Sequence, residues 1–148
     1  MPRTGNDAGQ IQLNLNTIMH EDRMAAPVSV DQNDCATEHW QDPARGSIGW
    51  KTLISGDLTA TNALVCGIAI MAAGDTFALH SHAEPELYFG LEGEVDVMID
   101  GVLHRLKPGV ALFIPGHAVH GVPTAHEPVR WLYTFAANAF PDIAYSFA

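Results

Sequence analysis

The chain has 148 residues, enough for one domain whose hydrophobic core needs no disulfide or metal to fold. Seventeen Asp and Glu residues against seven Lys and Arg give a formal charge of −10, which argues against a surface that binds phosphate backbones. We therefore expect no nucleic-acid partner and no membrane partner. A small molecule, a metal cation or a second copy of the chain is expected instead.

The sequence also predicts a cytoplasmic protein. No apolar run approaches the roughly 18 residues of a membrane-spanning helix, and the N-terminus has no continuous apolar core like that of a signal peptide. The two cysteines, Cys35 and Cys66, form neither a CxxC pair nor the framework of a small secreted domain, so we expect reduced thiols.

The first 45 residues differ in texture from the rest. Their apolar positions Ile11, Leu13, Leu15, Ile18 and Met19 fit neither strand nor helix spacing, and the stretch from Val28 to Arg45 is polar. We predict a short, partly helical N-terminal segment over residues 1–45, which packs on the barrel or on a partner subunit. The main domain is predicted over residues 46–148.

From Gly46 onward, short runs rich in β-branched and aromatic residues alternate with turn signals, which indicates strands. The nine runs are Trp50–Ile54, Ala63–Met71, Phe77–His82, Glu86–Leu91, Val95–Ile99, Val102–Leu106, Ala111–Ile114, His120–Val122 and Val129–Ala136. Asp100-Gly101 between two of them predicts a tight hairpin, because a type I′ turn needs positive φ at both central residues. The pattern predicts an all-β antiparallel sandwich or barrel.

Histidines and carboxylates concentrate at the end of one predicted strand. On a strand, residues two apart point to the same face, so His80 and His82 present two imidazoles side by side. The same parity adds Glu84, Glu86 and Tyr88 to that face. Pro85 cannot donate to a ladder, so a bulge or a loop is expected there instead of a continuous strand.

A third histidine, His120, follows a second strand that is delimited by Gly109 and Pro115. Neutral imidazoles with one carboxylate suit a divalent Fe, Mn, Ni or Zn ion. Three neutral donors and one anion also leave coordination positions open, as a catalytic metal site requires. The alternative for His80 and His82 alone is a pair of solvent-facing histidines on an amphipathic strand.

These two segments resemble the two motifs of the cupin superfamily. Gly74-x5-His80-x-His82-x3-Glu86-x6-Gly93 is similar to the first motif at every specified position. Gly109-x5-Pro115 followed by His120 is similar to the second, with His117 where the family usually has glycine. The resemblance implies a single-domain jelly-roll barrel with a metal held by His80, His82, Glu86 and His120.

The Glu86-x-Tyr88 arrangement, the short length and the aromatic ending resemble the cupin-type dimethylsulfoniopropionate (DMSP) lyases. That resemblance implies a metal-dependent β-elimination of DMSP to dimethyl sulfide and acrylate. It implies Tyr88 as the base that removes the α-proton, with Tyr145 or Tyr133 as a weaker candidate for a second functional tyrosine. The expected cofactor is Fe(II), with Mn(II), Ni(II) or Zn(II) as alternatives, and the expected assembly is a homodimer.

Two other functions remain open from the sequence. A cupin dioxygenase acting on a small carboxylate would need Fe(II) and O₂, and Tyr88 should matter far less to it. A non-enzymatic cupin that binds a small molecule would keep the same ligand set. Aromatic side chains such as Trp131 and Trp50 suit a sulfonium through cation–π attraction, but their spacing is equally that of a barrel core.

Overall fold

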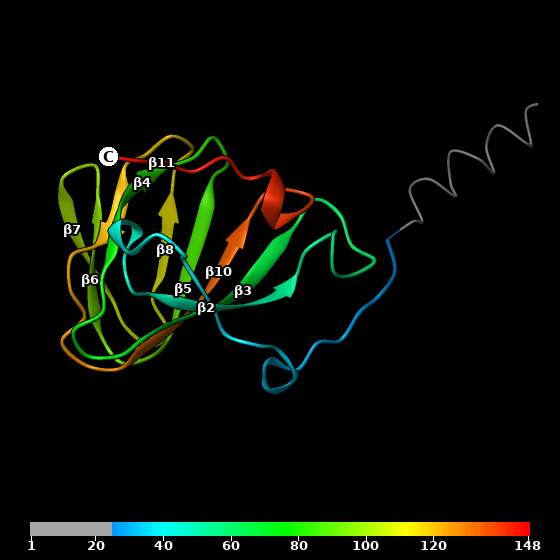
Figure 1. Cartoon of the computed structure of the whole chain (residues 1–148), viewed down its shortest axis with the longest axis horizontal. Coiled ribbons are helices and arrows are strands. Elements are labelled where there is room, and N and C mark those ends of the chain that lie inside the picture. Colours follow the sequence, from blue (N-terminus) through cyan, green and yellow to red (C-terminus); the bar gives the residue numbers. More distant parts are fainter. Residues whose placement is uncertain (1–24) are drawn as a thin grey trace, which may run out of the picture.

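The structure, a computed structural model, describes residues 25–148, and the apolar positions between residues 11 and 19 lie outside that range. Strands are the main regular secondary structure of the described chain (Figure 1). They are β1 (Glu38–His39), β2 (Gly49–Ile54), β3 (Val65–Met71), β4 (Phe77–Ser81), β5 (Glu86–Glu92), β6 (Val95–Ile99), β7 (Val102–Leu106), β8 (Ala111–Ile114), β9 (His120–Val122), β10 (Val129–Phe135) and β11 (Ser146–Phe147). Three short 3₁₀ helices are η1 (Gln32–Asp34), η2 (Pro43–Arg45) and η3 (Phe140–Asp142).

The strands form two antiparallel sheets. One has the order β1-β2-β3-β10-β5-β8 and the other the order β11-β4-β9-β6-β7. Strands distant in sequence are neighbours in both sheets, as β3 and β10 are, and the two sheets enclose one apolar interior (Figure 1). The predicted all-β jelly-roll barrel is confirmed.

All nine predicted runs are strands, with ends that differ by two residues or fewer. The hairpin between β6 and β7 is also confirmed, because Ile99 pairs with Val102 and both turn residues have positive φ, 47° at Asp100 and 81° at Gly101. The two-residue strands β1 and β11 were missed, since a strand this short carries no periodicity.

The described part of the N-terminal segment packs against the barrel through η1, β1 and η2. Its helical content is confined to η1 and η2, each capped by an aspartate side chain. The Lys51 ammonium donates to the backbone oxygen of Gln32 at 3.0 Å, and Arg130 donates to the Gln32 side chain. Thr52 donates to Glu38 at 2.7 Å. The boundary between residues 45 and 46 stays a prediction.

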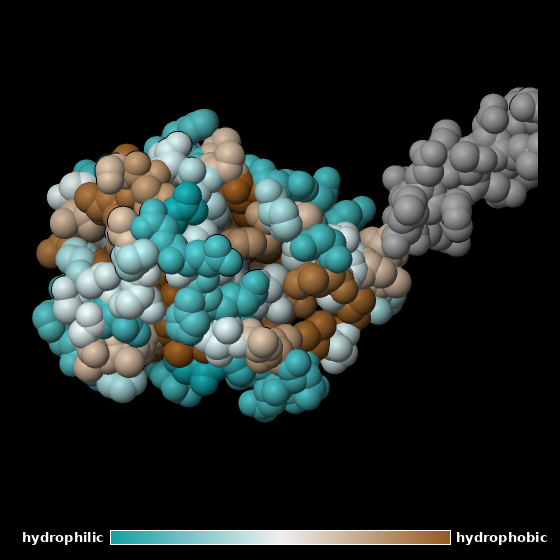
Figure 2. Space-filling model, in the orientation of Figure 1, coloured by the Kyte–Doolittle hydropathy of each residue, from teal (hydrophilic) through white to brown (hydrophobic). Residues whose placement is uncertain are grey.

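The core lies between the two sheets, where alternation along each strand selects the inward side chains. Along β10, Val129, Trp131, Tyr133 and Phe135 are buried while the residues between them are half-exposed. On the surface view, hydrophilic residues run through the middle of one face, with hydrophobic residues on either side (Figure 2). In residues 25–148, no helix has the length and apolarity needed to cross a bilayer.

Candidate metal centre and catalytic cavity

Three histidines meet inside the barrel. His80 lies on β4, His82 directly follows that strand, and His120 opens β9, where it pairs with His80 across the ladder. All three are buried, and each offers a nitrogen atom such that the three atoms lie within 4.8 Å of one another. The pairing of β4 with β9, which could not be predicted from the sequence, therefore brings His120 next to His80 and His82.

The ring tautomers follow from the backbone. Nδ1 of His80, His82 and His120 each lies 2.8 Å from a carbonyl oxygen, that of Ala78, Glu84 and Ala118 respectively. A carbonyl has no proton to give, so each Nδ1 must carry one and donate it. In the neutral ring, Nε2 then carries a lone pair, which is the form that a metal ion binds.

Glu86 supplies a carboxylate to the same cluster. Its Oε2 atom lies 3.1 Å from Nε2 of His82 and 3.1 Å from Nε2 of His120, and the side chain is buried. Nε2 of His80 is buried with no hydrogen-bond partner. Lone pairs at such distances repel unless a proton or a cation lies between them, so this donor set fits a divalent metal ion.

The protonation preferences of the histidines differ. Burial, assisted by the neighbouring His120, lowers the pKa of His80 to about 3. Burial also acts to lower the pKa of His82, but the hydrogen bond and the charge of Glu86 outweigh it and raise that pKa. The cluster therefore keeps His80 neutral at physiological pH, as a metal ligand must be.

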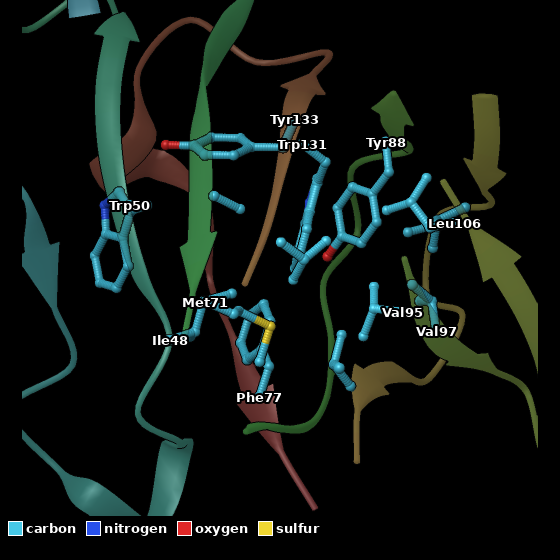
Figure 3. Close-up of a cluster of buried hydrophobic side chains, with 14 of the residues drawn as sticks. Ile48, Trp50, Met71, Phe77, Tyr88, Val95, Val97, Leu106, Trp131 and Tyr133 are labelled. Carbon is cyan, nitrogen blue, oxygen red and sulfur yellow. The ribbon is translucent and has the colours of Figure 1, made fainter. Parts of the chain in front are cut away.

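A cavity of about 30 Å³ opens beside Glu86. Nine of its twelve lining residues are aromatic, and Glu86 is the one charged side chain among them. Two of these aromatics, Tyr88 and Trp131, lie side by side with ring centroids 5.1 Å apart (Figure 3). The lining thus offers mainly ring faces to a ligand, and its polar atoms are the indole N–H groups, the phenol O–H groups and the Glu86 carboxylate.

The three predicted tyrosines take different positions. The ring of Tyr88 lies 6.3 Å from that of His120, while the ring of Tyr145 lies 5.4 Å from His80 and 5.2 Å from His82. Burial raises the pKa of both phenols well above the ordinary value, and the charge of Glu86 adds to the effect. Both tyrosines therefore lie beside the cluster and line the same cavity.

Tyr133 points elsewhere. Its hydroxyl lies over Gly67 of β3, where a Cβ atom would come within 2.3 Å of it (Figure 3). Gly67 is therefore required because a side chain would collide with the Tyr133 hydroxyl. Its backbone conformation is not the reason, since its φ angle is not in the left-handed region. Burial raises the pKa of Tyr133 as well.

Pro85 interrupts the strand, as expected, and residues 82–85 form a loop between β4 and β5. Glu84 consequently leaves the strand face, and its carboxylate lies 3.9 Å from Nδ1 of His82 at the edge of the cluster. Sequence reasoning missed Trp40, which also lines the cavity. The only signal was a lone tryptophan in a polar stretch.

Comparisons with known proteins agree with this geometry. Residues 67–135 match the family model of the cupin domain, Cupin_2. The dimethylsulfoniopropionate lyase DddW of Ruegeria pomeroyi is 41% identical over 121 residues, which cover 82% of this chain and 80% of DddW. The dimethylsulfoniopropionate lyase DddQ of the same organism is 33% identical over 70 residues, covering 47% of this chain and 35% of DddQ.

Among solved structures, a chain from the crystal structures of the DMSP lyases RdDddP and RnDddQII superposes with a TM-score of 0.65. The alignment covers 77% of this chain and 62% of that one, at 20% identity, so it supports the fold alone. The extent of the match to DddW is what identifies the family. The chain belongs to the cupin superfamily and, within it, to the family of the dimethylsulfoniopropionate lyase DddW.

Proposed function

We propose that this protein is a metal-dependent lyase that eliminates dimethyl sulfide from DMSP and leaves acrylate. The observation that carries the proposal is the 41% identity to DddW along most of both chains. The cavity agrees with it, because Tyr88 and Tyr145 line one aromatic enclosure together with Glu86, whose carboxylate contacts the histidine cluster. A chain of charge −10 also repels a small zwitterion less than it would repel a dianion.

We assign the metal ligands to His80, His82, Glu86 and His120, with Fe(II) as the native ion and Mn(II), Ni(II) or Zn(II) as substitutes. The support is the unpartnered Nε2 of His80 and the convergence of two further Nε2 atoms on one carboxylate oxygen. A bound dication supplies Lewis acidity, which makes protons next to a coordinated carboxylate more acidic and favours a nearby phenolate.

Tyr88 is assigned as the base. Its phenolate oxygen takes the α-proton, the Cβ–S electron pair leaves with neutral dimethyl sulfide, and the Cα=Cβ bond of acrylate forms. The buried ring, packed against Trp131, keeps bulk water from competing for the carbanion-like charge. Tyr145, whose ring lies beside those of His80 and His82, is the stronger candidate for a second functional tyrosine, and Tyr133 supports the cavity wall.

A homodimer in the cytoplasm completes the proposal. Cys35 and Cys66 are free thiols, which a reducing compartment would maintain. Size-exclusion chromatography with light scattering tests the assembly, and elution as a monomer at all concentrations would overturn that part.

The function is tested by headspace dimethyl sulfide from purified protein loaded with Fe(II) or Mn(II), with a chelated sample as control. Many turnovers per chain, lost on chelation and matched by acrylate in equal amount, are expected. An oxygen electrode separates the dioxygenase alternative, because β-elimination consumes no O₂. Absence of dimethyl sulfide with every metal would overturn the proposal.

A further inference from the structure

The N-terminal segment contributes one wall of the cavity. We call residues 38–45 the arm; it contains β1, Trp40 and η2. Trp40 is half-buried, and its ring centroid lies 4.8 Å from that of Trp50 on β2 and 5.2 Å from that of Tyr145. Its Nε1 atom is shielded from solvent and has no hydrogen-bond partner. The indole therefore serves no visible hydrogen-bonding purpose in the fold.

Trp40 lies one ring beyond the metal-type donors. Tyr145 is in contact range of Trp40 on one side and of His80 and His82 on the other. Trp40 itself does not pair with any of the three histidine rings, whereas Phe77 and Phe135 do. A short substrate with its carboxylate at the donors thus extends its opposite end toward Trp40 and Trp50.

That opposite end is a cation in the proposed substrate, and this step rests on the proposed function. A sulfonium has no N–H or O–H to donate, and the cavity's one charged group, Glu86, belongs to the donor cluster. Aromatic faces are the remaining source of attraction, and indole is the strongest of them. We propose that Trp40 is a specificity-determining residue, whose indole face, together with Trp50, recognises the sulfonium group.

The outer side of the indole is held by Arg45. Its guanidinium carbon lies 5.2 Å from the ring centroid of Trp40 and 4.6 Å from that of Phe147 on β11, so it joins the arm to the last strand. Trp40 and Trp50 also line a groove on the outside of the barrel, and so separate the cavity from that groove.

Two unreactive ligands of equal shape isolate the charge. Dimethylsulfonioacetate has no β-carbon and cannot eliminate, and 3-methylbutanoate is its isostere, with an uncharged CH group in place of the sulfonium and the same carboxylate. Binding of both to the metal-loaded protein is measured by calorimetry for the wild type and for Trp40→Leu. We expect Trp40→Leu to weaken dimethylsulfonioacetate binding about 3- to 30-fold, and 3-methylbutanoate binding less than about 2-fold.

Two further variants control the comparison. Trp40→Phe keeps an aromatic ring in the arm and should retain part of the preference for the sulfonium. Phe113→Leu replaces an exposed aromatic on β8, outside the cavity, and should change neither affinity. Thermal melts of each variant verify that the fold is intact.

The inference would be overturned if Trp40→Leu weakened the binding of both ligands equally, since Trp40 would then act through packing alone. It would also be overturned if the affinity for neither ligand changed, or if the wild type bound dimethylsulfonioacetate no more tightly than 3-methylbutanoate. A failure of the proposed function is visible separately, as absence of dimethyl sulfide from the wild-type protein. The binding comparison does not depend on turnover.

Discussion

Nε2 of His120 lies 3.1 Å from Oε2 of Glu86, while Nδ1 of the same ring donates to the carbonyl of Ala118. The backbone thus fixes which nitrogen faces the carboxylate. Because β9 pairs with β4 and Glu86 begins β5, this contact ties the two sheets together at the cluster. The same geometry makes His120 the test of the ligand assignment.

His120→Ala should lose most of its bound metal and at least about 100-fold of its turnover, since one of four ligands is removed. Metal per chain is measured by elemental analysis, and turnover by dimethyl sulfide release. His104→Ala is the matched control, because His104 is exposed on β7 and far from the cluster in the sheet order. Unchanged metal stoichiometry in His120→Ala would contradict the assignment.

Tyr88→Phe should retain metal and lower turnover by about 10²- to 10⁴-fold, because the ring that packs on Trp131 remains while the oxygen that takes the proton is gone. Elemental analysis of the same preparation separates this result from metal loss. Activity close to that of the wild type would remove Tyr88 from the role of base.

The sequence was informative wherever a local pattern decided the structure. Strand alternation put His80 and His82 on one face, and Pro85 correctly predicted the loop that removes Glu84 from it. Asp100-Gly101 predicted its hairpin because the turn requires positive φ.

Long-range pairing was out of reach of such patterns. The position of Trp40 depends on β1 joining β2 at the sheet edge, and that of Phe147 on β11 joining β4. Both strands have two residues, too few for any periodic signal. The aromatic wall of the cavity was therefore only partly predictable.

Acid should destabilise the metal-free protein partly through His80. Its pKa is about 3 in the folded state against 6.5 for an ordinary imidazole. As the pH falls below 6.5, His80 is therefore protonated in the unfolded chain but stays neutral in the folded chain, which favours unfolding. Stability is then lost at up to about 1.4 kcal/mol per pH unit until about pH 3. His82, with its raised pKa, contributes in the opposite sense, with stability present at low pH and lost as the pH rises.

Urea unfolding of chelated protein at several values between pH 7 and pH 4 measures this dependence. His80→Asn cannot titrate, so its unfolding free energy should fall less steeply with acid than that of the wild type. Parallel curves for the two proteins would refute the contribution of His80.

His117 has a φ of 66°, in the left-handed region, at the position where the cupin motif usually has glycine. The backbone there donates from its N–H to the carbonyl of His82 at 2.7 Å, so the conformation is held by a contact to the cluster. A side chain in this conformation costs about 1 kcal/mol relative to glycine, and the imidazole is exposed.

His117→Gly should therefore leave the free energy of unfolding unchanged or raise it by up to about 1 kcal/mol. His104→Gly, on the extended backbone of β7, should lower it by about 1 kcal/mol, and urea unfolding of both variants compares them. Equal destabilisation by the two changes would mean that the His117 side chain stabilises the turn more than its backbone conformation costs.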